Sequence, residues 1–377
     1  MRILQVSPFF SPHAGGVESH VRSLSGEMVR QGHEVTVLTS RFDRSLPVRE
    51  ELDGFTVIRS ATPAVWFNTP IDRGTRRAIR GIPTDVVHLH YPPPLSSYFA
   101  VRGLPRTFPP VCMTYHCDLY LPGISGRVLT TLYEQVFLRT TLRRVNRVIV
   151  HTRSYGNTSS PLRGRRLEII PSSVDTTRFR PDVSGEAVRR SLGLEGRRVI
   201  VFTGRLVFHK GVDALLRALV ELPPDVALLI IGRGPRLGEL RTVADRLGIG
   251  RRVAFCPNVS DEDLPTYLRA GDLFAFPSQN RLEGFGLAVA EAMASGLPVV
   301  IADMPGVREV IDPGVEGLLV EPMIPQDLAR RIRELLDDPT RLRRMGEAGR
   351  KRAEERFALP LIARAVLRLY ADLLATG

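Results

Sequence analysis

Residues 273–303, LFAFPSQNRLEGFGLAVAEAMASGLPVVIAD, decide the fold class of this chain. The apolar run 273–278 predicts a buried strand, and the polar, glycine-containing segment after it predicts a loop. Residues 287–295 then predict a short helix, and 298–303 predict a second buried strand. A strand, a helix and a strand in this order form a unit in which the two strands run parallel. The stretch therefore predicts an α/β fold on a parallel sheet.

The same order of elements continues on both sides of this stretch. Further strands are expected at 198–204, 227–232, 252–256 and 317–322, with helices at 212–222 and up to about residue 247. Three charged helical stretches follow at 326–337, 340–356 and 360–375. Because no strand is expected between them, the last helix need not pack on the sheet of its own half.

The first half has the same architecture with a different sequence. A strand at 3–7, a helix at 15–32 closed by Gly32 and a strand at 33–40 form its first parallel unit. Short β-rich runs then predict strands at 55–60, 85–91, 111–116, 147–152 and 167–173, with an amphipathic stretch from about 126 to 144. This half therefore also predicts a doubly wound parallel sheet.

The length of 377 residues favours two domains over one closed core. Residues 175–196, rich in charge with Pro181, Gly185 and Gly193, are interpreted as the connector. We expect a Rossmann-like domain at 1–180, a second at 181–358, and a C-terminal helix at 359–377 that can pack back on the first. Two such sheets would present the carboxyl ends of their strands to a cleft between them, where ligands bind in folds of this kind.

Composition excludes several classes of protein. Hydrophobic residues make up 43% and charged residues 24%, as in ordinary water-soluble domains. No stretch approaches the roughly 18 apolar residues of a spanning helix, and the opening MRILQVSPFF predicts a strand and not a signal peptide. Three scattered cysteines (Cys112, Cys117 and Cys256) predict neither a disulfide framework nor a zinc cluster. The expected location is the cytoplasm.

The net charge of +12 is concentrated in the first half of the chain. Residues 1–180 contain 24 arginines against 13 acidic residues, whereas 181–377 are nearly balanced. Arginine clusters at 73–80, 139–147 and 163–166 would suit an anionic membrane surface or a phosphorylated acceptor. A merely solvated basic face fits the same residues, and the near absence of lysine fits codon composition.

Candidate ligand-binding residues follow the predicted strands of the second half. The strand 198–204 ends in Gly204-Arg205, and Lys210-Gly211 opens the next helix, so two cations would meet a helix N-terminus in a clamp for a diphosphate. Gly232 follows another strand, where a tight turn beside a base pocket is as plausible as a binding role. An exposed Arg and Lys in an ordinary loop is the structural alternative.

The loop and helix after residue 278 contain two glutamates in an E-x7-E spacing. Glu283 precedes the helix, whereas Glu291 lies about one turn inside it, where its carboxylate can accept both hydroxyls of a ribose. Between them, the backbone amides around Phe285, Gly286 and Leu287 can meet an anion. A carboxylate beside a sugar can bind its hydroxyls or stabilise positive charge at the anomeric carbon. The alternative is a capping glutamate before a buried helix.

The first half offers fewer candidates. Gly15-Gly16 start a helix after the first strand, but the segment matches neither a dinucleotide fingerprint nor a P-loop, which argues against an oxidoreductase. His116 ends a strand and is the candidate acid–base group, with a structural histidine as the alternative. His88 and His90 share one face of a strand, but no third metal ligand is evident at a suitable spacing. No metal site is therefore expected.

Together these segments resemble the retaining, nucleotide-sugar-dependent glycosyltransferases of family 4, also described as glycosyl transferases group 1. The resemblance covers nearly the whole chain, and its most specific parts are GGVESHVRSLSGEMVRQGHEVTVLT (15–39), TGRLVFHKG (203–211), PSQNRLEGFGLAVAEAMASGLPVV (277–300) and PGVREVI (305–311). It implies the GT-B architecture, with two Rossmann-like domains facing across a cleft. It also implies hexosyl transfer from a nucleoside-diphosphate sugar to a hydroxyl, with retention of configuration.

The resemblance also implies roles for single residues. Arg205 and Lys210 would hold the donor diphosphate, Glu291 the ribose and Glu283 the transferred sugar. The amides around Phe285, Gly286 and Leu287 would lie against sugar and phosphate, Gly15-Gly16 would approach from the other domain, and His116 would lie beside the donor sugar. Such enzymes generally need no metal or other cofactor, because the two cations stabilise the leaving diphosphate. The absence of an Asp-x-Asp motif at a strand end agrees.

Three positions depart from the family pattern. Pro171-Ser172-Ser173-Val174-Asp175 stands where the family usually has Pro-Asn-Gly-Val-Asp, so a glycine that tolerates positive φ is missing. His209 replaces an acidic residue, and Pro257 replaces a common glycine near the base. These differences concern the details of donor binding.

Competing functions remain for comparison. The expected partners are a nucleotide sugar, a lipid-linked, phosphorylated or saccharide acceptor, and an anionic surface on the cytoplasmic face of a membrane. A sugar-nucleotide epimerase or a non-catalytic nucleotide-sugar-binding protein would share the scaffold. The charge alone suggests nucleic-acid binding, but basic runs interleaved with aromatic residues are absent from the sequence, so no nucleic acid is expected. The base, the sugar and the acceptor do not follow from the sequence.

Overall fold

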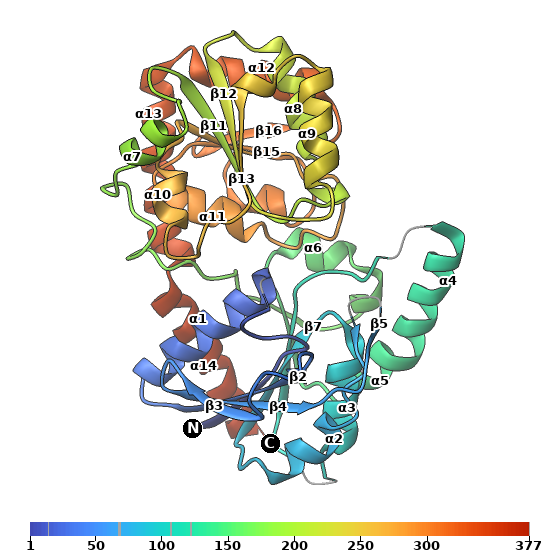
Figure 1. Cartoon of the computed structure of the whole chain (residues 1–377). Helices are drawn as coiled ribbons and strands as arrows, with labels where there is room; N and C mark the ends of the chain where they lie inside the picture. The colour runs from blue at the N-terminus through green and yellow to red at the C-terminus, as the bar shows by residue number, and fades with distance from the viewer. Residues whose placement is uncertain (14, 67–68, 106–107, 121–122, 377) are drawn as a thin grey trace. The chain divides into compact units, whose positions relative to one another are not determined.

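The computed structural model describes residues 1–13, 15–66, 69–105, 108–120 and 123–376 (Figure 1). The chain forms two compact units. The first unit comprises Met1–Ser173 together with Leu359–Gly377, and the second comprises Val174–Ala358. The chain thus returns to its first unit for its last helix.

A mostly parallel sheet forms the centre of the first unit. In the described part of the chain it has eight strands in the order β10-β9-β8-β7-β1-β2-β4-β3, and β3 alone pairs antiparallel. The strands are β1 (Arg2–Val6), β2 (Glu34–Arg41), β3 (Arg49–Leu52), β4 (Phe55–Ala61), β7 (Val86–Tyr91), β8 (Val111–Tyr115), β9 (Arg147–Val150) and β10 (Leu167–Ile169). A separate hairpin pairs β5 (Val65–Trp66) with β6 (Thr69–Pro70).

Both faces of this sheet are buried. Alternate residues point to opposite faces, so Ile3 joins a core with α1 and α14, whereas Leu4 joins a core on the other side. This explains why the central strands are continuous apolar runs. The helical elements are α1 (Gly16–Arg30), α2 (Thr75–Ala78), η1 (Ile79–Gly81), α3 (Pro94–Gly103), α4 (Gly123–Tyr133), η2 (Glu134–Leu138), α5 (Arg139–Leu142), α6 (Arg153–Thr158), η3 (Ser160–Leu162) and α14 (Leu359–Thr376).

The second unit is built on an entirely parallel sheet. Among its described residues the strand order is β13-β12-β11-β14-β15-β16. The strands are β11 (Arg198–Thr203), β12 (Val226–Ile231), β13 (Val253–Cys256), β14 (Leu273–Phe276), β15 (Val299–Ala302) and β16 (Gly317–Val320). The order reverses direction between β11 and β14, which makes the edge beyond these two strands the switch point where ligands bind in open α/β sheets.

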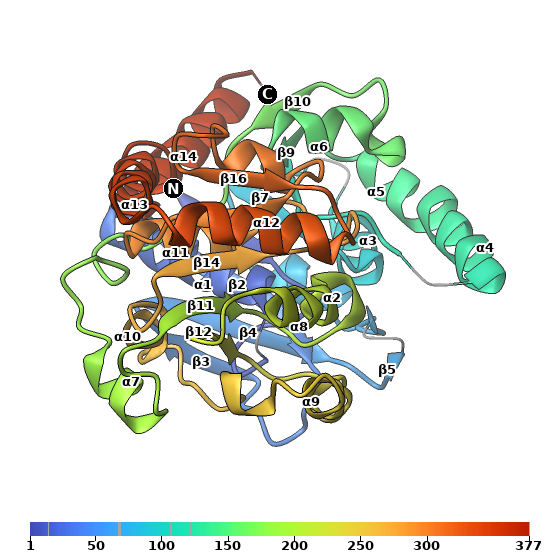
Figure 2. The same ribbon diagram turned by 90° about the horizontal axis from the view of Figure 1, so that it is seen from above.

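Helices cover the second sheet on both sides, as the view from above shows (Figure 2). They are α7 (Glu186–Ser191), η4 (Phe208–Lys210), α8 (Val212–Glu221), α9 (Leu237–Arg246), η5 (Gly250–Arg252), α10 (Leu264–Leu268), α11 (Leu287–Ala294), η6 (Val307–Val310), α12 (Pro325–Leu336), α13 (Pro339–Arg352) and η7 (Ala353–Phe357). The doubly wound fold expected from the sequence is confirmed for both units.

The segment interpreted as a connector packs onto the second unit. Arg189 on α7 pairs with Asp272 at 2.7 Å and donates to the carbonyl of Ala270. A Cβ at Gly185 would lie 2.2 Å from the backbone N of Ala270, so glycine is needed for this contact. Residues 174–196 are therefore part of the second unit and not a free linker.

The last helix, α14, packs on α1 of the first unit (Figure 1). Its buried side, which includes Ile362, Val366, Tyr370 and Leu373, joins the core on that face of the sheet. Burial of these side chains is what ties the end of the chain to the first unit. Within the described residues, no helix is both long enough and apolar enough to cross a bilayer.

Two neighbouring leucines on α14 provide a test of this packing. Leu373 is 4% exposed and Leu374 is 41% exposed. Leu373→Ala is expected to lower the free energy of unfolding of the first unit by about 2–4 kcal/mol, because it leaves a cavity, whereas Leu374→Ala should change it by less than about 0.5 kcal/mol. Urea unfolding followed by circular dichroism measures both, and equal effects would contradict the packing of α14.

Candidate active site

Loops from adjacent strands meet at the switch edge of the second sheet. β11 and β14 pair in parallel, so the loops that follow them leave the sheet side by side. The carbonyl of His209 accepts hydrogen bonds from the Gln279 backbone N–H (2.7 Å) and the Ser278 hydroxyl (3.1 Å). Gly211 has φ +70°, and a Cβ there would lie 2.0 Å from the Pro277 carbonyl oxygen. Glycine at 211 therefore lets the two loops touch.

This contact brings Lys210 and Glu283 together in an ion pair. The two side chains are 15% and 13% exposed, and the Lys210 ammonium also lies 4.8 Å from the centroid of the Phe276 ring. An ammonium group has three N–H donors. Glu283 therefore orients Lys210 and leaves donors for an anion at the same edge.

Gly204 and Gly232 lie beside this pair. A Cβ at Gly204 would be 3.8 Å from the Lys210 ammonium, and a Cβ at Gly232 would be 2.2 Å from the Gly204 carbonyl oxygen. Both glycines have φ in the region that other residues rarely adopt. Arg205 follows on the surface, and its guanidinium has no hydrogen-bond or ion-pair partner among the described residues. It carries a free positive charge close enough to His209 to help lower the pKa of that ring.

The N-terminus of α11 points toward the same edge, because this helix follows β14. Gly286 precedes it in the left-handed conformation, with φ 83°, and no side chain caps its first turn within the described residues. The Phe285 side chain is buried against Phe357 at 5.4 Å between ring centroids. Phe285 is therefore able to offer a ligand only its backbone, whereas Leu287 is half-buried at the helix start.

Glu291 lies on α11, facing this group of residues. Burial raises the pKa of its carboxyl to about 7, with the charge of Asp261 adding to the shift and the charges of Arg178 and Lys210 opposing it. The pKa of His209 moves the other way, to about 4, because of burial and the nearby Lys210. His209 is therefore neutral near pH 7, while Glu291 is poised between its two forms.

In the first unit, the N-terminus of α1 follows β1. Gly15 precedes the helix, and a Cβ there would lie 2.3 Å from the Glu18 carboxylate, which pairs with His13 at 2.8 Å. Gly16 is exposed, and a Cβ there would meet no described atom within 4 Å. The helix start is thus open at the carboxyl edge of the sheet.

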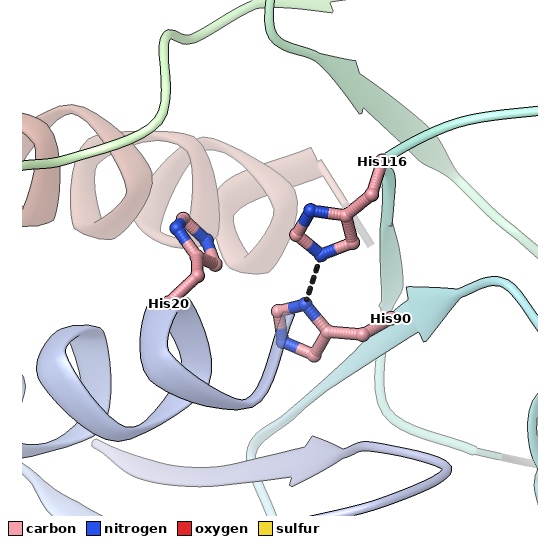
Figure 3. A group of neighbouring side chains, drawn as sticks. All are labelled: His20, His90 and His116. Atoms are coloured by element: carbon pink, nitrogen blue, oxygen red, sulfur yellow. Dashed lines mark hydrogen bonds between the residues drawn. The ribbon is translucent and has the colours of Figure 1, made fainter. Parts of the chain in front are cut away.

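Five of the eight histidines of the chain gather at this edge. His116 follows β8, and its Nε2 lies 3.1 Å from Nδ1 of His90 at the end of β7 (Figure 3). Its Nδ1 lies 3.0 Å from Nε2 of His151, which follows β9. The His20 ring on α1 is 5.2 Å from the His116 ring, and the His88 ring lies 4.5 Å from the His90 ring at a tilt of 33°.

Burial lowers the pKa of every ring in this cluster, to about 3 for His88 and about 4 for His151. The rings are therefore neutral near pH 7. From the sequence, His88 and His90 had no evident third partner, and the approach of His20 and His151 to His116 was missed. The strand-end positions of His116 and His151 were a usable signal, because neighbouring parallel strands end at one edge.

The candidate residues thus form two groups. One group lies at the switch edge of the second sheet and contains Gly204, Arg205, Lys210, Gly232, Glu283, Phe285, Gly286, Leu287 and Glu291. The other lies at the carboxyl edge of the first sheet and contains Gly15, Gly16 and His116. The loop that departs from the family pattern needs no glycine, since Ser173 is not among the residues with positive φ.

Two family models match the chain. Residues 14–178 match Glycosyltransferase Family 4, and residues 185–352 match Glycosyl transferases group 1. A GDP-mannose-dependent alpha-(1-6)-phosphatidylinositol monomannoside mannosyltransferase of Mycolicibacterium smegmatis is 32% identical over 92% of both chains. A D-inositol 3-phosphate glycosyltransferase of Xylanimonas cellulosilytica is 31% identical over 99% of this chain and 96% of its own length.

Solved structures agree on the fold. A sucrose-phosphate synthase from Thermosynechococcus elongatus has a TM-score of 0.85 at 24% identity and covers 100% of both chains. Anabaena HepE, solved in complex with UDP-glucose, has a TM-score of 0.79 at 22% identity, also over 100% of both chains. With the sequence matches across both units, these likenesses establish that the chain belongs to glycosyltransferase family 4 and has the GT-B fold.

Proposed function

We propose that this glycosyltransferase moves a hexosyl group from a nucleoside-diphosphate sugar to an acceptor hydroxyl, with retention of configuration and without a metal. The observation that supports this most strongly is the Lys210–Glu283 pair at the switch edge of the second sheet, with Arg205 and the α11 N-terminus around it. Positive side chains and free backbone amides converge there, as binding of a diphosphate requires.

The donor residues have distinct proposed roles. Arg205, Lys210 and the amides at Gly286 and Leu287 hold the diphosphate, and the backbone at Gly204 and Gly232 lets it approach closely. Glu291 accepts hydrogen bonds from the ribose hydroxyls. Glu283 contacts the transferred sugar, because it is fixed by Lys210 beside the diphosphate site. The same two cations would stabilise the leaving diphosphate, which is the work that a metal does in other enzymes.

The first unit is proposed to bind the acceptor. Gly15-Gly16 provide an open helix start, and His116 lies beside the donor sugar. Retention would follow from attack on the same face of the sugar, with the leaving phosphate helping to remove the proton of the acceptor hydroxyl. An epimerase or a non-catalytic binding protein is the competing proposal, and product analysis with a matching donor separates the three.

The acceptor is proposed to be lipid-linked, phosphorylated or a saccharide. The names of the two curated relatives describe acceptors that contain inositol, one within a phospholipid and one as an inositol phosphate. The first 180 residues have the basic excess that suits such an anionic acceptor. This favours a phosphorylated group in the acceptor over a neutral sugar.

Helix α4 provides a surface for a membrane that contains such an acceptor. Large apolar side chains lie four residues apart along α4 and the η2 turn that continues it: Ile124, Val128 and Leu132 on α4 and Val136 on η2 are 83%, 65%, 56% and 44% exposed. Exposed arginines, including Arg127 and Arg139, lie in the same stretch. In both views the helix extends away from the sheet of its own unit (Figures 1 and 2). An apolar stripe with basic flanks fits an anionic lipid surface, so we propose peripheral binding on the cytoplasmic face.

The chain has two lysines, which allows a matched test of the diphosphate site. Lys210→Ala is expected to slow transfer at least about 100-fold, because it removes an oriented positive charge from the leaving group. Lys351→Ala, a 75% exposed lysine paired with Glu355, should leave the rate unchanged. Initial rates with the best donor from a nucleotide-sugar panel measure both, and near-normal turnover of the Lys210 variant would contradict the proposal.

The raised pKa of Glu291 predicts how donor binding depends on pH. The ionised carboxylate accepts from both ribose hydroxyls, so affinity for the nucleoside diphosphate should rise as the pH increases through about 7 and then level off. Glu291→Gln should lack this rise. Calorimetric titrations of the wild type and of Glu291→Gln between pH 5.5 and pH 8.5, about 1.5 units on either side of this pKa, measure both affinities. In the ratio of the wild-type affinity to the variant affinity, the effect of phosphate ionisation cancels. A constant ratio would exclude Glu291 from ribose binding.

The membrane proposal is tested with vesicles. The protein should co-sediment with vesicles that contain phosphatidylglycerol but not with pure phosphatidylcholine, and binding should weaken as salt is raised. The double variant Ile124→Asp/Val128→Asp should bind at least about tenfold less, because it removes the exposed apolar surface. Val315→Asp, at a 51% exposed valine of the second unit, is the control. Unchanged binding of the double variant would exclude α4 as the contact.

A further inference from the structure

The histidine cluster of the first unit contains a set of converging nitrogens. One ring nitrogen from each of His20, His90 and His116 lies within 4.8 Å of the others (Figure 3). The His90 and His116 nitrogens are 3.1 Å apart. Two imidazoles bound tetrahedrally to Zn²⁺ at about 2.0–2.1 Å hold their nitrogens roughly 3.3 Å apart. The spacing of these two rings therefore already suits a metal, and His20 needs only a small movement.

The second nitrogen of each of these three rings is held by a group other than the three rings themselves. His20 Nδ1 lies 3.2 Å from the Ser172 hydroxyl, His90 Nε2 lies 2.8 Å from Gln5 Oε1, and His116 Nδ1 lies 3.0 Å from His151 Nε2. Histidines that bind metals have this arrangement, because the outer hydrogen bond fixes the ring and its tautomer. The arrangement leaves His20 Nε2, His90 Nδ1 and His116 Nε2 facing inward.

The outer hydrogen bonds determine which ring nitrogens carry a proton and which inner nitrogens carry a lone pair. His151 Nδ1 faces the Ile170 carbonyl oxygen at 3.1 Å and must donate to it, so its Nε2 accepts a hydrogen bond from the N–H at His116 Nδ1. Neutral His116 then has a lone pair on Nε2. Gln5 Oε1 likewise requires the proton of His90 on Nε2, which leaves a lone pair on Nδ1. With the Gln5 amide in this orientation two lone pairs face each other at 3.1 Å, which is repulsive unless a proton or a metal cation lies between them.

Two other arrangements would also remove this repulsion. A second proton on His90 would place a positive charge on a fully buried ring that lies among other imidazoles, which is costly. Turning the Gln5 amide over would leave a proton on His90 Nδ1 for His116 Nε2, and it would exchange the N–H···S contact with Met28 at 3.6 Å for an amide oxygen there, beside the Tyr370 hydroxyl. A metal ion satisfies the rings with the hydrogen bonds as they stand.

We infer that His20, His90 and His116 form a binding site for a divalent transition-metal ion of the Zn²⁺ or Co²⁺ type, which inhibits transfer when it is bound. Neutral imidazoles are the ligands that such ions prefer, and three of them leave a fourth position open. His116 is half-buried, so the ion has access from the surface. Inhibition follows because the ion occupies Nε2 of His116; this part rests on the proposed place of His116 beside the donor sugar.

Metal binding is measured without reference to activity. The full-length, metal-free protein should bind one Co²⁺ with the intense visible absorption of a four-coordinate ion, and Zn²⁺ should displace it. His20→Ala should weaken Zn²⁺ binding at least about 100-fold in competition with a chromophoric chelator. His33→Ala, at a histidine beside the amino terminus and outside the cluster, should bind as the wild type does. His20→Asn provides a second variant, and circular dichroism confirms that each variant is folded.

The possible outcomes distinguish metal binding from inhibition of transfer. Failure of the wild type to bind either metal more tightly than the His20 variants would overturn the site. Zn²⁺ should slow transfer by the wild type. When each protein is compared with its own rate in the absence of metal, His20→Ala should need at least about 100-fold more Zn²⁺ for the same fractional loss of rate. Binding without inhibition would overturn the regulatory part alone. Absence of transfer with every donor would instead count against the proposed function, with metal binding unaffected.

Discussion

The close approach of two backbone segments at one sheet edge determines the chemistry of the second unit. β11 and β14 are neighbours in the sheet but are separated in sequence by two other strands, so the loops that follow them meet at the switch point. Gly211 against Pro277 allows these two loops to touch where any side chain would collide, and Gly232 against Gly204 does the same for the loops after β12 and β11. Lys210 reaches Glu283 only because the backbones are this close. A methyl group at Gly211 would separate the β11 and β14 loops and with them the charged side chains.

The charges at this edge are balanced in a way that favours an anion. Glu283 neutralises Lys210, and burial keeps Glu291 near the point of half-protonation at neutral pH. His209 is neutral, and the charge of Arg205 has no counterion among the described residues. A diphosphate would find the positive charge of Arg205, the remaining N–H donors of Lys210 and the backbone amides of α11 already in place. Groups positioned before the ligand arrives do not have to be reorganised during the reaction.

The sequence was sufficient for the periodic elements and insufficient for contacts between distant residues. Strands such as β11 and β14 are short apolar runs that end at polar residues, so their bounds were predicted closely. The edge strand β3 was missed because its residues REEL are charged, although Asp53-Gly54, both at positive φ, mark the hairpin that pairs it with β4. The position of α14 on the first unit follows from its apolar side only once the core that covers it is known. The histidine cluster depends on the order of β7, β8 and β9 in the sheet, which propensity does not determine.

The claim that the edge between β11 and β14 holds a diphosphate is tested most directly by comparing nucleotides that differ by one phosphate. Calorimetric titration of the full chain with the mono- and diphosphates of guanosine, uridine and adenosine isolates the second phosphate. For the base that binds, the diphosphate should bind at least about tenfold more tightly than the monophosphate, because it adds charge-assisted hydrogen bonds to Arg205 and Lys210. Equal affinity for the two would mean that these residues hold no diphosphate, and the account of the site would be wrong.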